Sequence, residues 1–274
     1  MLEYAFCNEL LAAEGKTLGE QARIARDLGY VGLELAPFTL GEAPDRLDRH
    51  AVAAIRAQVE DAGVRVTGLH WLLSHLPEAS ITDPARSDEA QAVLLRLIDL
   101  CADLGGRILV HGSPNQRLRP DGISDAALLD QLAAFFAPVA QRAGERGVTY
   151  CIEPLAEADT IGTVAEGVEL VEAVDHPAFR TMIDCSAAGR REPPVAGLIQ
   201  RWVPTGHIAH IHANDTNRGG PGMGDDPMHE IVAALMQTGW EHPIGVEPFR
   251  TVVDATATAA VGIATLRACE RTLT

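Results

Sequence analysis

The chain has 274 residues, 47% hydrophobic and 22% charged, which is enough for one large domain with a substantial core. Its 38 acidic against 22 basic residues give a formal charge of −16, which disfavours nucleic acid and anionic membranes as partners. The apolar runs are too short to cross a bilayer. The five cysteines are scattered and form no C-x-x-C pair, and the N-terminal residues do not have the basic and apolar character of a secretion signal. We therefore predict a cytoplasmic protein with reduced cysteines.

Short runs rich in Val, Ile and Leu recur along the chain, separated by longer segments of helical spacing. Their apolar character on both faces is typical of parallel strands that are buried on both sides. We predict eight such strands: Tyr4–Cys7, Val31–Leu35, Val64–Leu69, Arg107–His111, Val148–Ile152, Arg180–Asp184, Ile208–His212 and Ile244–Val246.

The segments between these strands carry helix start signals. Thr17–Glu20 and Thr163–Glu166 have the capping-box form, a hydroxyl followed three residues later by a carboxylate. Eight strand–helix units in a chain of this length predict an α/β fold, a single (β/α)8 TIM barrel that forms one domain over residues 1–274. A doubly wound sheet is the alternative, but the first strand runs into Asn8–Leu11 and not into a glycine-rich phosphate-binding turn.

Four consecutive predicted strands end in a carboxylate or an imidazole, contributed by Glu153, Asp184, His212 and Glu247. In such a barrel the carboxyl ends of the strands form the active-site face. One isolated acidic residue there is explained equally well by helix capping, but packing alone does not select four in succession. Three carboxylates and one imidazole suit Mn²⁺, Mg²⁺ or Co²⁺. His210 points to the same side as His212, and His212 is better placed because it lies nearer the rim.

Four segments carry a resemblance to a known family: Cys151–Leu155, Met182–Asp184, His210–Arg218 with Pro221–Gly224, and Gly245–Phe249. They resemble the xylose isomerase-like sugar isomerase/epimerase superfamily and, within it, ketose 3-epimerases such as tagatose 3-epimerase. The resemblance implies one divalent metal, most of all Mn²⁺, on Glu153, Asp184, His212 and Glu247. It also implies that Arg218 holds oxygens of a small sugar or keto-polyol, and that the protein forms dimers or tetramers.

The expected chemistry moves a proton on a carbon next to a ketone, through an enediolate whose negative charge a divalent cation stabilises. Inverting that carbon requires a base on one face and an acid on the other. We expect Glu153 and Glu247 to bind the metal and also to exchange protons with the substrate. Asp184 and His212 are then ligands only. An aldose–ketose isomerase needs the same metal and acid–base residues, but it moves the proton on one face of the substrate only.

Two positions depart from the ketose 3-epimerase pattern. Ala187 stands where a substrate-binding His is usual, three residues after Asp184, and Asp159 stands where Glu is usual, six residues after Glu153. These changes leave the predicted metal site intact but alter the expected pocket. The substrate is therefore left open among another ketose, a keto-inositol and an oxidised glycoside.

Further residues are candidates for substrate contact, but each also has a purely structural explanation. His70 and His111 stand at the ends of two predicted strands. Each is expected to contact the substrate, to bind a second metal or to pack in the core. Glu34 is expected either to hydrogen-bond a substrate hydroxyl or to pair with an arginine. Trp71 is expected either to stack on the apolar face of a sugar or to pack against neighbouring side chains. The loop Gly112–Arg117 is expected either to bind a phosphate or carboxylate group or to be an ordinary surface loop.

Three other functions remain as alternatives. A metal-dependent lyase or dehydratase acting on a keto-inositol or oxidised glycoside starts with the same proton removal. An endonuclease on this barrel needs an imidazole where Ala187 stands and a basic groove that the charge of −16 does not indicate. A non-catalytic sugar-binding barrel is the third, because fold does not dictate function.

Overall fold

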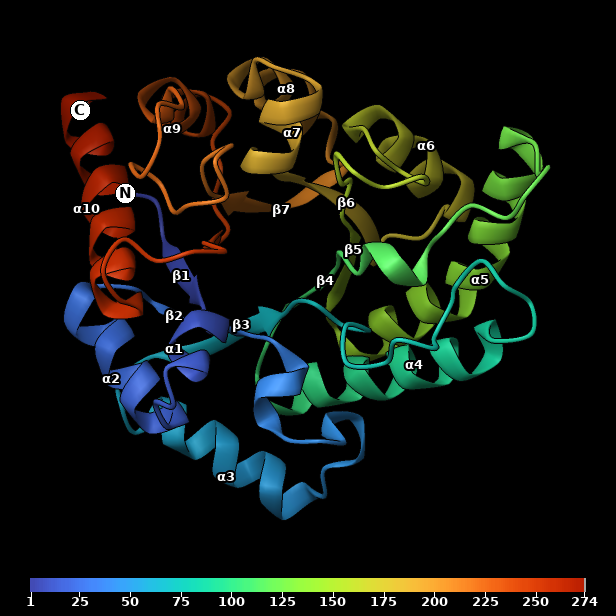
Figure 1. Ribbon diagram of the computed structural model, residues 1–274, viewed down its shortest axis with the longest axis horizontal. Coiled ribbons are helices and arrows are strands. Elements are labelled where there is room, and N and C mark those ends of the chain that lie inside the picture. The colour runs from blue at the N-terminus through green and yellow to red at the C-terminus, as the bar shows by residue number, and fades with distance from the viewer. Residues whose placement is uncertain (274) are drawn as a thin grey trace.

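The computed structural model describes residues 1–273 and confirms the predicted barrel. Eight parallel strands close in sequence order, and β1 pairs with both β2 and β8 (Figure 1). The strands are β1 Tyr4–Cys7, β2 Gly32–Leu35, β3 Arg65–Leu69, β4 Ile108–His111, β5 Thr149–Ile152, β6 Phe179–Asp184, β7 Ile208–Ala213 and β8 Ile244–Val246. Each begins and ends within one residue of its predicted bounds, because a buried parallel strand must be apolar along its whole length.

Helices ring the barrel on the outside (Figure 1). They are α1 Glu9–Ala13, α2 Leu18–Leu28, α3 Arg49–Glu60, α4 Ser87–Asp103, α5 Asp125–Arg146, α6 Val164–Val174, α7 Cys185–Arg191, α8 Val195–Trp202, α9 Met228–Gln237 and α10 Ala255–Leu273. Both predicted capping boxes are formed, at the starts of α2 and α6. Within residues 1–273 no helix combines the length and the apolar character that a bilayer span requires.

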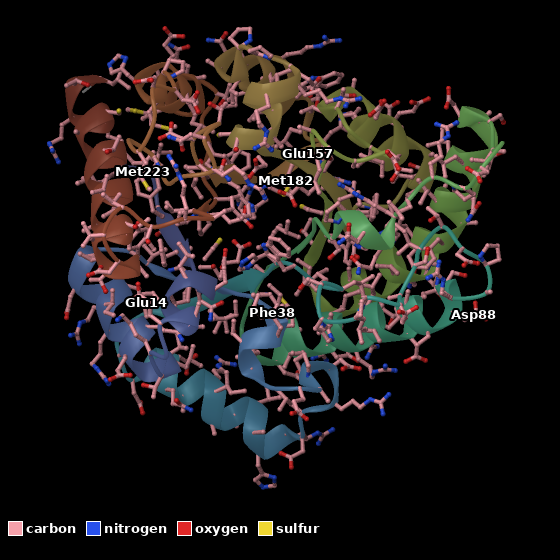
Figure 2. The ribbon with its side chains drawn as sticks, in the orientation of Figure 1. Glu14, Phe38, Asp88, Glu157, Met182 and Met223 are labelled. Carbon is pink, nitrogen blue, oxygen red and sulfur yellow. The ribbon has the colours of Figure 1, made fainter. Side chains whose placement is uncertain are left out.

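The core has two parts. The larger part fills the space between the outer faces of the strands and the helices. A small cluster of Val110, Cys151 and Met182 fills the middle of the barrel, and Figure 2 shows Met182 near the centre of the ring of strands. Because side chains alternate along a strand, the residues two positions after Cys151 and Met182 point inward as well, one layer nearer the rim. The barrel is therefore apolar at mid-height and charged at its carboxyl end.

The strand register brings the charged layer to one level. Asp184 on β6 lies opposite His212 on β7, which in turn lies opposite Gly245 on β8. The β6–β7 register shifts by one residue between Thr181 and Met182. Such a bulge re-aims the side chains that follow it. Here it places the Asp184 carboxylate beside the His212 ring at the rim.

Candidate metal centre and active site

Glu153, Asp184, His212 and Glu247, the four side chains predicted at the strand ends, lie together in the structure. Each offers one nitrogen or oxygen atom, and these four atoms all lie within 4.8 Å of one another. His212 Nδ1 lies 3.0 Å from Glu247 Oε2, 3.8 Å from Glu153 Oε1 and 3.9 Å from Asp184 Oδ2. All four residues are at most 5% exposed.

The donor set fits a divalent cation. His212 Nδ1 and Glu247 Oε2 are buried, and apart from their own 3.0 Å contact neither has a hydrogen-bond partner among residues 1–273. Within residues 1–273 no lysine or arginine nitrogen lies within 4.0 Å of the carboxylates of Glu153, Asp184 or Glu247. Three buried carboxylates without a cation carry a large desolvation and repulsion cost, which a bound metal removes. Mostly oxygen ligands with one imidazole suit Mn²⁺, Mg²⁺ or Co²⁺.

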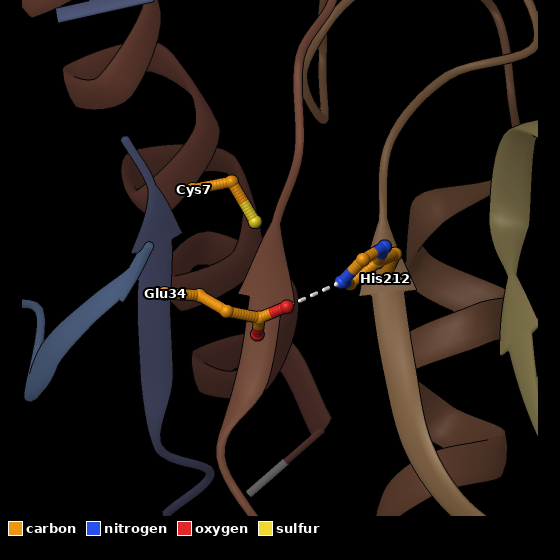
Figure 3. Close-up of side chains that lie close together, drawn as sticks. All are labelled: Cys7, Glu34 and His212. Atoms are coloured by element: carbon orange, nitrogen blue, oxygen red, sulfur yellow. Dashed lines mark hydrogen bonds and ion pairs between the residues drawn. The ribbon is translucent and has the colours of Figure 1, made fainter. Parts of the chain in front are cut away.

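Glu34 on β2 fixes which nitrogen of His212 faces the cluster. His212 Nε2 donates to Glu34 Oε1 at 3.0 Å (Figure 3). The other ring nitrogen, Nδ1, therefore points toward the carboxylates of the cluster. His210 Nε2 lies 2.9 Å from the other Glu34 oxygen, one layer deeper in the barrel. Of the two histidines, His212 is the one whose ring lies beside the three carboxylates. Gly245 makes room, since a Cβ there would lie 2.7 Å from the His212 ring.

Cys7 on β1 completes a second buried group with Glu34 and His212 (Figure 3). Burial, followed by the charge of Glu34, raises the pKa of the Cys7 thiol well above its usual value, so the sulfur keeps its proton. Burial alone would raise the pKa of Glu34, but His210 and His212 hold it well below its usual range. Cys7 and Glu34 thus form a buried layer beneath the metal cluster, in contact with the His212 ring.

Other side chains orient the carboxylates. Asn214 Nδ2 donates to Asp184 Oδ2 at 2.6 Å, and the Ala187 N–H donates to Asp184 Oδ1 at 2.6 Å. Trp71 Nε1 donates to Glu247 Oε1 at 3.1 Å, which leaves Oε2 facing His212. Sequence reasoning missed Asn214. Its position two residues after His212, on the same side of the chain, was the available signal.

The crowded negative charge shifts the pKa values of the cluster. Burial, with the charges of Glu153 and Asp184, raises the pKa of Glu247 to about 8. Burial and the charge of Glu153 raise the pKa of Asp184 to about 6. Burial alone would lower the pKa of His212, but Glu247 and Glu34 raise it well above its usual value. Without a metal, the cluster therefore retains protons at neutral pH.

A cavity of about 550 Å³, part of it open to solvent, lies over the four clustered residues. Trp71 and Phe249 form an apolar wall, with their rings edge to face at 6.2 Å. Arg218 also lines the cavity, and its Cζ lies 5.1 Å from the Phe249 ring. Trp71 and Arg218 have φ angles of 55° and 66° in the left-handed region, strained for non-glycine residues and typical of binding sites.

The other predicted contact residues differ in their placement. His70 is buried yet lines the cavity, and its Nε2 lies 2.9 Å from Glu9 Oε2. His111 lies outside the cavity lining, with Nδ1 2.5 Å from the Tyr150 hydroxyl and its ring against Phe136. Burial, followed by the charge of Arg117, lowers the pKa of His111 to about 3, so this imidazole is neutral. His111 therefore belongs to the packed core of the barrel wall.

Two acidic residues also differ from expectation. Asp159 is exposed and does not line the cavity, whereas Glu157, two residues earlier on the same loop, does. Figure 2 shows Glu157 above the ring of strands, toward α6 and α7. The family pattern placed the acidic contact residue six positions after Glu153, but the loop turns so that the residue four positions after Glu153 faces the cavity. Glu34 lies beneath the cluster and not in the cavity wall.

The loop after β4 buries Arg117 and does not bring it into the cavity lining. Arg117 is fully buried, and none of its three guanidinium nitrogens has a hydrogen-bond partner among the described residues. Burial lowers its pKa to about 10, against the opposing charges of Glu153 and Tyr150. Gly112 and Ser113 line the cavity, and a Cβ on Gly112 would collide with the Glu153 carboxylate. The loop therefore packs directly against the Glu153 carboxylate.

Known proteins share this architecture and parts of the sequence. Over 113 residues the chain is 34% identical to D-psicose 3-epimerase of Ruminiclostridium cellulolyticum, a match that covers 40% of this chain and 38% of that relative. It is 26% identical over 247 residues to a putative hydroxypyruvate isomerase of Streptomyces coelicolor, covering 83% and 84% of the two chains.

Solved structures show the same fold. L-ribulose 3-epimerase superposes with a TM-score of 0.82 at 20% identity, over 100% of this chain and 97% of that one. The 3-keto-D-glucoside 4-epimerase of E. coli gives 0.81 at 18% identity, over 98% and 100%. The family model described as xylose isomerase-like TIM barrel matches residues 22–269. The chain therefore belongs to the xylose isomerase-like TIM barrel family.

Proposed function

We propose that the protein is a divalent-metal-dependent isomerase or epimerase of a ketose or related keto-polyol. The observation that carries this proposal is the position of Glu153, Asp184, His212 and Glu247 at the bottom of a cavity that is open to solvent. Relatives named D-psicose 3-epimerase and L-ribulose 3-epimerase support the sugar class. Mn²⁺ is the proposed metal, with Mg²⁺ and Co²⁺ as alternatives that the same oxygen-rich ligands accept.

These four side chains would hold the metal. When bound, the metal supplies Lewis-acid stabilisation of the negative charge that develops as the substrate loses a proton. Asp184 has both oxygens engaged, by Asn214 and by the N–H of Ala187, and so acts as a fixed ligand. His212 is fixed in the same way by Glu34. Neither is free to move a proton to and from the substrate.

Glu153 and Glu247 are the proposed acid–base pair. They follow β5 and β8, which stand three strands apart around the ring, so their carboxylates reach the cavity from different sides. One removes the proton from the carbon next to the ketone and the other returns it to the opposite face. The Trp71 N–H holds one oxygen of Glu247 and thereby directs the carboxylate. The Trp71 and Phe249 rings form an apolar wall on that side.

Proton exchange tests the proposal directly. The Mn²⁺-loaded protein is incubated in D₂O with D-psicose, D-tagatose, D-fructose and D-sorbose. We expect one deuterium at the carbon next to the ketone, with the carbon skeleton retained and an epimer or isomer formed. Glu247→Gln should abolish exchange, while Glu169→Gln, an exposed change on α6, should leave it intact. Full activity after exhaustive chelation contradicts the proposal.

A lyase acting on an oxidised glycoside or keto-inositol is the second candidate. The observation that favours it is Ala187, which lines the cavity with only a methyl group and leaves space for a bulkier substrate. β-Elimination begins with the same proton removal next to a carbonyl. Loss of water from a keto-inositol, or of the glycosidic alcohol from a 3-keto-glucoside, seen as a mass change when these compounds are added to the D₂O incubation, identifies this reaction in place of epimerisation.

A further inference from the structure

Two arginines face the cavity at its solvent side. Arg190 on α7 and Arg218 after β7 both line it, and the Arg190 side chain is 27% exposed while Arg218 is an exposed residue. The metal cluster, at most 5% exposed, forms the floor of the same cavity. The cavity therefore has an acidic, metal-binding floor and a basic mouth, within a chain whose formal charge is −16.

The mouth carries more positive than negative charge. Arg190 Nη2 lies 3.0 Å from the Glu157 carboxylate, whose side chain is 62% exposed. Within residues 1–273 no carboxylate oxygen lies within 4.0 Å of the Arg218 guanidinium, which lies over the Phe249 ring instead. Of the four acidic residues that line the cavity, Glu153, Asp184 and Glu247 belong to the metal cluster, and Glu157 lies beside Arg190. Arg190 is thus paired with a carboxylate of the protein, whereas Arg218 has no such partner among the described residues, and an anionic ligand can supply one.

Arg190 is held in place by the protein but keeps free donors. Its Nη1 donates to Ser186 Oγ at 3.1 Å and its Nη2 donates to Glu157. A guanidinium has five N–H donors, so three remain for a ligand. Ala187 lies three residues earlier on the same helix face and contributes only a methyl group, so it leaves the approach to Arg190 open.

We propose that the substrate carries an anionic terminal group, a carboxylate or a phosphate ester, which Arg190 and Arg218 bind at the mouth while the keto end lies over Glu153 and Glu247. This inference rests on the proposed function and names the substrate class within it. Guanidinium groups bind carboxylate and phosphate oxygens through paired, charge-assisted hydrogen bonds, which neutral hydroxyls do not match in strength. The arginines thus select an acidic keto-sugar over its neutral counterpart.

A matched substrate series tests the inference. D-fructose, D-fructuronate and D-fructose 6-phosphate differ only at the terminal carbon, as alcohol, carboxylate and phosphate ester. The same series is made for the psicose, tagatose and sorbose configurations, and solvent deuterium incorporation by the Mn²⁺-loaded protein gives kcat/KM for each. We expect the better of the two acidic forms to exceed the neutral ketose of the same configuration by about tenfold or more.

The outcomes separate the two proposals. If a neutral ketose is exchanged as well as its acidic forms, the anionic-substrate inference is wrong and the proposed function stands. If no compound in any configuration is exchanged, the proposed function fails, and this inference fails with it. The larger of the carboxylate and phosphate values identifies which anionic group the mouth accepts.

Variants of the arginine provide a second, independent readout. Arg190→Gln should lower the acidic-to-neutral ratio of kcat/KM by about ten- to a hundredfold, through a higher KM for the acidic substrate. Arg190→Lys should retain part of the ratio, because it keeps the charge but loses the planar fork. Arg201→Gln, an exposed change on α8, serves as the matched control. An unchanged ratio in Arg190→Gln and in Arg218→Gln refutes the inference.

Discussion

Glu34 and His212 form the contact that gives the metal cluster its geometry. The Nε2–H of His212 donates to Glu34 Oε1 at 3.0 Å, so the ring presents Nδ1 to the three carboxylates. Glu34 is fully buried, and a second imidazole, that of His210, holds its other oxygen. A carboxylate behind a histidine fixes both the ring orientation and the tautomer of a metal ligand. The strand that carries Glu34 thus supports a cluster whose residues lie two to four strands away around the barrel.

Replacing Glu34 therefore weakens metal binding without touching a ligand. We expect Glu34→Gln to lower the affinity for Mn²⁺ by about ten- to a hundredfold, because the amide accepts more weakly from His212 and no longer offers a negative charge. Calorimetric titration of the metal-free protein with Mn²⁺ measures this change. Glu169→Gln, which is exposed on α6, is the control. An unchanged Mn²⁺ affinity in Glu34→Gln would show that the contact has only a packing role.

Removing the Trp71 N–H tests the orientation of Glu247. Trp71→Phe keeps an aromatic ring against Phe249 but removes the donor to Glu247 Oε1. We expect kcat for the exchange reaction to fall by about tenfold, a typical cost of losing one hydrogen bond, with little change in thermal stability. Trp202→Phe on the outer helix α8 controls for the change of ring. A variant with normal kcat would mean that Glu247 needs no such direction.

Gly245 tests how closely the cluster is packed. A Cβ at this position would lie 2.7 Å from the His212 ring and 3.1 Å from Glu34. We expect Gly245→Ala to destabilise the fold by about 1–3 kcal/mol and to weaken Mn²⁺ binding, because the ring must shift from its place. Chemical denaturation and Mn²⁺ titration measure the two effects. Gly197→Ala on α8, where the added Cβ meets only ordinary contact at 3.5 Å, should be close to neutral.

Metal binding should depend on pH in a defined direction. In the metal-free protein burial, with the charges of neighbouring carboxylates, raises the pKa of Glu247 to about 8 and that of Asp184 to about 6. Both groups are protonated below these values, and the metal must displace the protons. Affinity should therefore fall as the pH is lowered from 8 to 6, by up to about tenfold per unit for each proton displaced.

Titrations in two buffers with different heats of ionisation count the protons that Mn²⁺ releases. We expect release at pH 7, since Glu247 still holds its proton there. The raised carboxyl pKa values also mean that the metal-free native state binds more protons than the unfolded chain between about pH 4 and 8. Its stability should therefore decrease as the pH rises through this window. A flat affinity from pH 6 to 8, with no proton release, contradicts this account.

The sequence by itself determined the strands, their closure into a barrel and the four rim residues. Each buried parallel strand must be apolar throughout, so its limits are visible in composition, and its carboxyl end marks the active-site face. Glu153, Asp184, His212 and Glu247 could therefore be assigned to one face from their positions after Ile152, Ile183, Ile211 and Val246. This reasoning needs only chain order and side-chain alternation.

Only the tertiary structure decided how other side chains are used. Loop conformation places Glu157 in the cavity and Asp159 in solvent, and no periodicity describes a loop. The cross-barrel contact from Glu34 selects Nδ1 of His212, and contact with Tyr150 and Phe136 withdraws His111 from the cavity. Such contacts join residues far apart in the chain. Their outcome depends on distances between strands and helices that the order of amino acids alone does not reveal.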